Sequence, residues 1–189
     1  MPKIWEDTVD AHRDAVKEAI AKATAKLVHR DGVTGLTMSA IATEAGVGRA
    51  TLYRYVKDAK AALELWQAYG IEFHIQQLND IATTAPADRR LAAVLERYAL
   101  NRQHRHGPAH SDLRHSDALL SPARKEVRRL VTELLIAESM RGNVRTDMPP
   151  DHLAAYAVAA MDAASDLPTP HAARHLAQLV HTSLLVPGG

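Results

Sequence analysis

The sequence contains no cysteine, and only 4% of its 189 residues are aromatic. Without cysteine the chain has no disulfide, no thiolate metal site and no thiol nucleophile, which is typical of a protein in a reducing compartment such as the cytoplasm. The scarcity of aromatics, combined with 34 alanines, favours helices over sheets. Alanine loses no side-chain entropy in a helix, whereas strands prefer β-branched and aromatic residues. We therefore expect a cytoplasmic protein built from helices.

Long hydrophobic runs and a large net charge are missing as well. No apolar run approaches the ~20 residues of a membrane-spanning helix. The first twenty residues carry five acidic side chains, unlike a secretory signal, so we expect no contact with a membrane. The formal net charge is +1, from 23 basic and 22 acidic residues, and this overall balance gives no indication of a nucleic-acid partner.

Apolar residues recur at intervals of three and four along most of the chain, which predicts an all-α fold of about nine helices. Two pairs of an N-cap residue followed by proline, Ser121-Pro122 and Thr169-Pro170, mark expected helix starts. Asp58 is expected to cap a long helix that Gly70 interrupts, and close packing or a bend would explain this glycine. The helices are expected over residues 11–30, 38–45, 48–56, 59–82, about 87–105, 109–120, 121–141, 151–164 and 170–186.

Residues 37–56 predict a helix-turn-helix, because the tight turn Ala45-Gly46-Val47 separates two short helices. With Ile41 and Leu52 packed inward, the second helix presents a polar face to solvent. Such a helix fits the major groove of B-DNA, where arginine can bind guanine in a bidentate way and threonine or alanine can touch a thymine methyl group. Tyrosine and lysine suit phosphates, which fix register without reading sequence. The predicted DNA-binding residues are Thr37, Ser39, Gly48, Arg49, Ala50, Thr51, Tyr53, Arg54, Tyr55, Lys57 and Lys60.

The segment from Met38 to Val56, MSAIATEAGVGRATLYRYV, resembles the DNA-binding signature of the TetR-family transcriptional regulators. The Ala-Gly-Val turn and the Thr-Leu-Tyr run carry this resemblance. The segment departs from the family at Gly48, where a capping serine is common, and Ala59 stands where the family usually has a phosphate-binding lysine. The resemblance implies a helix-turn-helix domain over residues 1–57 and a helical ligand-binding and dimerisation domain over residues 58–189.

Regulators of this kind are homodimers that bind a palindromic operator in double-stranded DNA and release it when a small molecule enters the C-terminal domain. The resemblance therefore implies a ligand-responsive repressor that is not an enzyme and needs no cofactor. The last two helices would form the dimer interface. The residues expected there are Leu153, Ala157, Met161, Ala164, Leu176, Val180 and Leu184.

The effector pocket that the resemblance implies is harder to assign from the sequence. Its predicted residues could equally fill the core, and Arg102 near a helix C-terminus is also a favourable partner for the helix dipole in water. Residues 86–130 hold ten Lys and Arg against five Asp and Glu, which is compatible with an anionic ligand. The predicted ligand-binding residues are Trp66, Tyr69, Phe73, Tyr98, Arg102 and Tyr156.

Two other interpretations remain open. A small helical metal-dependent enzyme or sensor could use the cluster of His104, His106, His110 and His115. A metal site needs three or more converging ligands, and the first two of these histidines lie on opposite helix faces, so we predict no metal site. The other interpretation is a helical interaction module whose exposed Tyr53 and Arg54 contact a protein instead of DNA.

Overall fold

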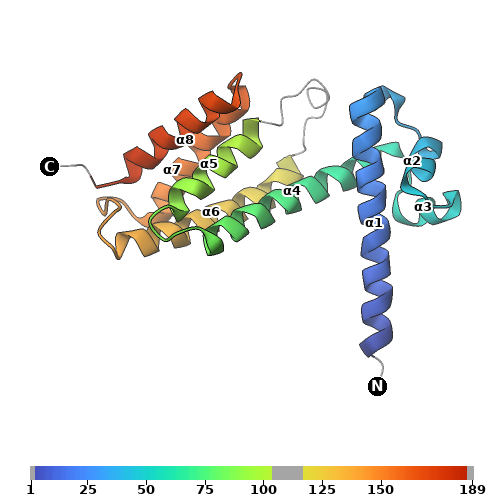
Figure 1. Cartoon of the computed structure of the whole chain (residues 1–189), viewed down its shortest axis with the longest axis horizontal. Helices are drawn as coiled ribbons and strands as arrows, with labels where there is room; N and C mark the ends of the chain where they lie inside the picture. Colours follow the sequence, from blue (N-terminus) through green and yellow to red (C-terminus); the bar gives the residue numbers. More distant parts are fainter. Residues whose placement is uncertain (1–2, 104–116, 187–189) are drawn as a thin grey trace. The chain divides into compact units, whose positions relative to one another are not determined.

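A computed structural model of the chain describes residues 3–103 and 117–186, and Figure 1 shows how their helices are arranged. These residues contain no strand apart from an isolated antiparallel bridge between Val144 and Leu185, which confirms the all-α fold. None of the described helices is long and apolar enough to cross a membrane. The α-helices are α1 (Lys3–Asp31), α2 (Met38–Ala45), α3 (Arg49–Tyr55), α4 (Ala59–Thr84), α5 (Arg90–Gln103), α6 (Asp117–Ser139), α7 (Pro150–Asp162) and α8 (Pro170–Leu184).

The chain divides into two compact units, Met1–Ile71 and Glu72–Gly189. Helix α4 contributes residues to both units, whereas the predicted boundary after residue 57 separates the helix-turn-helix from everything that follows. That functional boundary stays a prediction. Gly70 lies just before the division, and a Cβ atom there would meet no other atom within 4 Å. Close packing among the described residues therefore does not account for this glycine.

Short-range capping determines where the helices of the first unit begin. The Thr37 Oγ1 atom accepts a hydrogen bond from the Ala40 amide at 3.2 Å, and the Asp58 Oδ1 atom accepts one from the Ala61 amide at 2.7 Å. Both satisfy amides that a helix start leaves without a partner. Helix α1 ends at Asp31, and the next residue, Gly32, has a positive φ of 73° that suits glycine. These three predicted boundaries are confirmed.

The core of the first unit forms on one face of α1. Val16, Ile20, Ala23 and Leu27, which the sequence spacing places on one face, are all buried. Thr24 is buried beside them, and its hydroxyl donates to the Ile20 carbonyl oxygen at 2.8 Å. A hydroxyl bonded within its own helix in this way needs no other partner in an apolar core.

The second unit has a core to which α4, α5, α6, α7 and α8 all contribute, with Leu78, Leu95 and Leu135 among its fully buried side chains. Most of the predicted dimer residues lie in this core: Leu153, Ala157, Met161, Ala164, Val180 and Leu184 are buried, and Leu176 packs against them partly buried. The face of α7 and α8 that is richest in these side chains therefore packs inside a single chain. It leaves almost no surface on which a second copy of the chain could pack.

Helix α6 differs from the prediction at its start. The described part of this helix begins at Asp117 and contains Pro122 within it, so the predicted start at Ser121-Pro122 is wrong. Pro122 is the sixth residue of the described helix, where its missing amide removes one donor from the helical hydrogen-bond pattern. Residues 109–116 of the preceding predicted helix lie outside the described residues. Thr169, in contrast, caps α8 as predicted, accepting from the Ala172 amide at 3.2 Å.

Candidate nucleic-acid interface

The turn between α2 and α3 fixes the position of α3 in the first unit. Gly46 has a φ of 66°, a left-handed conformation that costs a residue with a side chain about 1–2 kcal/mol. The Val47 amide donates to the Ala42 carbonyl oxygen at 3.1 Å, which closes the end of α2. Ile41 and Leu52 are fully buried. Helix α3 is therefore held by its inner, apolar face.

The outer face of α3 is polar and open to solvent. Arg49, Ala50, Tyr53 and Arg54 are exposed, with 55% of Tyr53 accessible, while Thr51 and Tyr55 are half-buried. The flanking positions that the sequence assigns to DNA are exposed as well; they are Thr37, Ser39, Gly48, Lys57 and Lys60. A short helix with one buried and one polar, accessible face has the geometry that major-groove recognition requires.

One contact joins the beginnings of α2 and α3. The Arg49 guanidinium donates a hydrogen bond from Nη2 to the Ser39 Oγ atom. Both residues remain exposed, so the contact orients the arginine without removing it from solvent. An arginine held in this way retains the other donors of its planar group for a base edge.

The basic residues of this surface are not neutralised by the carboxylates around them. Within the described part of the chain, neither Arg54 nor Lys57 forms an ion pair, and Lys60 reaches Glu64 only at 3.9 Å with both side chains exposed. Glu44 of α2 is paired with Lys26 at 2.5 Å, and the Asp58 carboxylate caps α4. The positive charge of α3 and of the residues after it is therefore available to a partner.

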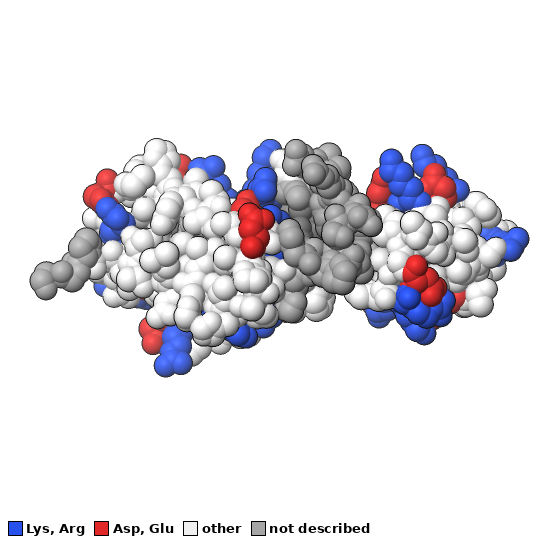
Figure 2. Space-filling view, turned by 90° about the horizontal axis from the view of Figure 1, so that it is seen from above, with Lys and Arg blue, Asp and Glu red and all other residues white. Residues whose placement is uncertain are grey.

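This charge is local rather than spread over the molecule. On the face that Figure 2 shows, basic groups lie in several separate places, most of them with acidic groups beside them. Such a distribution agrees with a net charge of +1. It indicates that binding to phosphates would depend on a few residues and not on a broad electrostatic field.

The comparisons with known proteins agree with this arrangement. Residues 20–58 match the model of the family described as bacterial regulatory proteins, tetR family. No curated protein matches the chain closely enough to be compared with it. The matched residues run from the middle of α1 to the cap of α4 and include the whole helix-turn-helix.

Similar solved structures extend over most of the chain. A TetR/AcrR-family transcriptional regulator from Thermobifida fusca has a TM-score of 0.70 and 16% identity, covering 87% of this chain and 95% of its own. A TetR-family regulator from Pectobacterium atrosepticum also has a TM-score of 0.70, with 17% identity, 95% of this chain covered and 98% of its own. AibR, solved with isovaleryl coenzyme A and operator DNA, has a TM-score of 0.57 and 19% identity, covering 92% of this chain and 100% of its own.

The fold and the exposed polar α3 define a helix-turn-helix of the kind found in DNA-binding proteins, followed by a second, helical unit. Residues 20–58 are similar to the DNA-binding segment of the TetR-family regulators, and this match rests on the helix-turn-helix itself. Regulators of this family bind operator DNA and typically respond to small effectors.

The predicted ligand residues do not form one described cluster. Trp66 and Tyr69 belong to the first unit, where the Trp66 ring lies 6.0 Å from the His29 ring and the Tyr69 hydroxyl donates to the Asp14 carbonyl oxygen at 3.4 Å. Phe73 of the second unit is 60% exposed. The Tyr156 hydroxyl lies 3.1 Å from the Ser183 hydroxyl between α7 and α8. A ligand-binding role for these four residues stays a prediction.

Tyr98 and Arg102 meet at one carboxylate, Asp162 at the end of α7. The Tyr98 hydroxyl donates to Asp162 Oδ1 at 3.2 Å, and the Arg102 Nε atom lies 3.0 Å from the same oxygen. Burial, and secondarily the Asp162 charge, raise the pKa of Tyr98 to about 12, so its hydroxyl stays protonated. Arg124 of α6 reaches the other oxygen of Asp162 at 3.0 Å. One carboxylate therefore links α5, α6 and α7.

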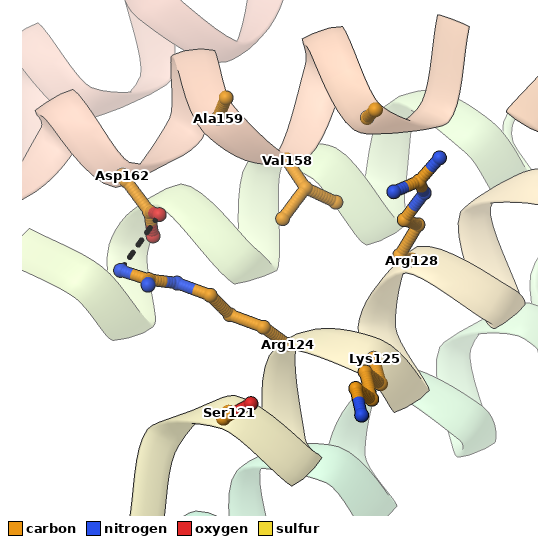
Figure 3. A pocket seen from close by; sticks show the side chains of 8 residues that line it. Ser121, Arg124, Lys125, Arg128, Val158, Ala159 and Asp162 are labelled. Carbon is orange, nitrogen blue, oxygen red and sulfur yellow. Dashed lines mark ion pairs between the residues drawn. The ribbon is translucent and has the colours of Figure 1, made fainter. Parts of the chain in front are cut away.

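This carboxylate borders a groove of about 550 Å³ between α6 and α7. In Figure 3, Arg124 and Arg128 extend from α6 towards α7 on either side of Val158, and the ion pair of Arg124 with Asp162 closes one end. The Arg128 Nη2 atom donates to the Asp151 carbonyl oxygen at 3.1 Å. The groove is lined by Ser121, Arg124, Lys125, Arg128, Ala155, Val158, Ala159 and Asp162.

Sequence reasoning did not identify this groove. The excess of basic residues over positions 86–130 was the available signal, but it did not indicate which of them share a surface. The histidine cluster that the metal-dependent alternative requires, His104, His106, His110 and His115, lies outside the described residues. Across residues 3–103 and 117–186, no group of three or more His, Asp or Glu side chains is placed to hold a metal ion.

Proposed function

We propose that the protein binds a palindromic operator as a homodimer in the cytoplasm and releases it when a small molecule binds the second unit. The observation that carries this proposal is the outer face of α3, where Arg49, Tyr53 and Arg54 are exposed and no carboxylate of the described residues pairs with the arginines. Arginine at such a position can bind guanine, and the neighbouring tyrosine and lysine side chains can bind phosphates.

Dimer formation is supported by large apolar side chains on α7 and α8 that the described residues leave exposed. Leu179 of α8 is 67% exposed and Tyr156 of α7 is 47% exposed. Large apolar side chains exposed together are typical of interaction sites. We assign the dimer contact to this face in place of the buried one.

Release by a ligand is supported by the way charged groups connect the helices of the second unit. A ligand that changes the position of Arg124 also changes the environment of Asp162, Arg102 and Tyr98. Helix α4 contributes Leu78 to the core of the same unit and continues into the first unit. A ligand lowers DNA affinity to the extent that it binds the DNA-incompetent arrangement more tightly.

Selection of bound sequences from a pool of random duplexes at low salt tests this proposal. We expect enrichment of an inverted repeat whose half-sites are about one helical turn, ~34 Å, apart. Sedimentation of the complex should give two chains for each selected duplex. Failure to enrich any sequence would contradict the proposal and favour the protein-interaction module, in which Tyr53 and Arg54 contact another protein.

A further inference from the structure

The groove between α6 and α7 has more positive charge than the carboxylates beside it can balance. Arg102, Arg124, Lys125 and Arg128 lie at or next to it, and the carboxylates within ion-pair distance are Asp162 and Asp151. Asp162 is shared by two guanidinium groups, while Asp151 lies 3.8 Å from Arg128. Lys125 has no ion pair in the described structure. Among the described residues, the groove therefore has two more basic side chains than carboxylates.

We propose that this groove binds the phosphate groups of an organic phosphate, with the apolar part of that ligand lying against α7. The two arginines are four residues apart on α6, so both guanidinium groups face α7 across the same space (Figure 3). The opposite wall consists of Ala155, Val158 and Ala159. The volume of about 550 Å³ lies within the range of small-molecule sites.

Phosphate suits this groove better than a single carboxylate does. Arginine binds phosphate oxygens through two parallel hydrogen bonds, and such bonds between charged groups are about twice as strong as neutral ones. A ligand must also displace Asp162 from Arg124, or share that arginine with it. A phosphate with two negative charges competes with one carboxylate more effectively than another carboxylate does.

Binding in the groove would act on the interior of the unit through Asp162. When a phosphate attracts Arg124, Asp162 keeps Arg102 and Tyr98 as its partners. The balance of charge at the end of α7 then changes next to α5. In this respect the inference rests on the proposed function, because it treats the groove as the effector site of a DNA-binding regulator.

Calorimetric titration of the full chain tests the inference with three probes: coenzyme A, isovaleryl coenzyme A and isovalerate. The coenzymes carry phosphates, whereas isovalerate offers the same short acyl group with a carboxylate only. We expect both coenzymes to bind with saturation and isovalerate to bind at least about tenfold more weakly, since each lost charge-assisted hydrogen bond costs about 1.5 kcal/mol or more.

Variants of the groove locate the binding. Arg124→Gln and Arg128→Gln should each weaken coenzyme A binding about tenfold. Lys125→Gln should weaken it only about two- to threefold, because this side chain is exposed and contributes mainly charge. Arg124→Lys should fall between the wild type and Arg124→Gln, because it keeps the charge but loses the planar group.

Arg129→Gln is the matched control. Arg129 is on the same helix but pairs with Glu126 and Glu133, and it does not line the groove. Coenzyme A binding by this variant should equal that of the wild type. The inference is overturned when neither coenzyme binds, when isovalerate binds as tightly as isovaleryl coenzyme A, or when Arg129→Gln weakens binding as much as Arg124→Gln.

DNA binding by the same preparations separates this inference from the proposed function. Coenzyme binding that requires Arg124 and Arg128, with no effect on the affinity for the selected duplex, supports the groove and contradicts ligand-induced release. Coenzyme binding without any DNA binding supports the groove and contradicts the regulator. DNA binding without coenzyme binding supports the regulator and overturns the groove.

Discussion

Helices α3 and α6 both carry arginines on exposed surfaces, but they use them differently. Each of the three arginines of α6 has a carboxylate partner: Arg124 pairs with Asp162, Arg128 with Asp151, and Arg129 with Glu126 and Glu133. The two arginines of α3 have no carboxylate partner among the described residues. An arginine that is paired with a carboxylate stabilises the protein and binds another anion only when that anion competes with its partner. An unpaired arginine on a rigid helix can bind a polyanion such as DNA directly.

The largest difference that we expect is between substitutions on the inner face and on the outer face of α3, measured by the free energy of unfolding. Leu52 is fully buried, so Leu52→Ala should lower the free energy of unfolding by about 2–5 kcal/mol through lost burial and the cavity left behind. Tyr53→Ala on the outer face should change it by less than about 0.5 kcal/mol. Denaturant unfolding of both variants measures this difference. Equal losses would mean that the outer face also holds the helix in place.

Asp162, which joins three helices of the second unit, should contribute more to the free energy of unfolding than Asp151, an exposed carboxylate on the same helix. Asp162→Ala leaves the largely buried Arg102 without its partner, and we expect a loss of about 2–3 kcal/mol, below the value for a fully buried pair because Asp162 is partly exposed. Asp151→Ala, with a partner only at 3.8 Å, should cost less than about 1 kcal/mol. Thermal and denaturant unfolding compare them, and equal effects would rule out a structural role for the Asp162 network.

On the outer surface of the helix-turn-helix, we expect Arg49 to recognise a base and Lys57 to contact a phosphate. Arg49→Ala should lose about 1–3 kcal/mol on the selected duplex and relax the preference at one base pair. Lys57→Ala should weaken all duplexes alike and reduce the slope of log affinity against log salt by about one. Titration against a set of single-base variants distinguishes the two patterns. If Arg49→Ala weakened the affinity for all duplexes equally, Arg49 would contact phosphate and not a base.

The smallest effect should come from a histidine of the second unit. Burial lowers the pKa of His181 below its ordinary value of 6.5, with Glu138 opposing the shift. Below pH 6.5, His181 is therefore protonated to a greater extent in the unfolded chain than in the folded chain. The free energy of unfolding consequently decreases as the pH falls. Unfolding measured from pH 7 to pH 5 should show a weaker pH dependence for His181→Gln than for the wild type. Exposed His175→Gln serves as the control, and an identical pH dependence for all three proteins would exclude the effect.

Local chemistry explains what could be predicted from the sequence. Thr37, Asp58 and Thr169 each accept a hydrogen bond from an amide three residues later. Such helix starts can be predicted because both partners lie close together in the sequence. The turn at Gly46 and the inner and outer faces of α3 follow from the same short range. The recurrence of apolar residues also places Val16 and Ile20 correctly in the core.

Long-range contacts explain what could not be predicted. Asp162 meets Arg102 and Arg124 from 60 and 38 residues away, and no local pattern pairs them. The apolar spacing on α7 and α8 identified an apolar face correctly but could not distinguish a core from a dimer contact, because both are apolar. Ser121-Pro122 predicted a helix start, but Pro122 lies within a helix whose described part begins at Asp117.

The affinity of one selected duplex for matched arginine variants tests the central comparison most directly. Fluorescence anisotropy at a fixed salt concentration would compare the wild type with Arg49→Ala, Arg54→Ala, Arg124→Ala and Arg129→Ala. We expect the two α3 variants to bind at least about fivefold more weakly, since a lost base or phosphate contact costs about 1 kcal/mol or more. The two α6 variants should bind as the wild type does. Unchanged binding by the α3 variants, or equal losses in both helices, would contradict this expectation.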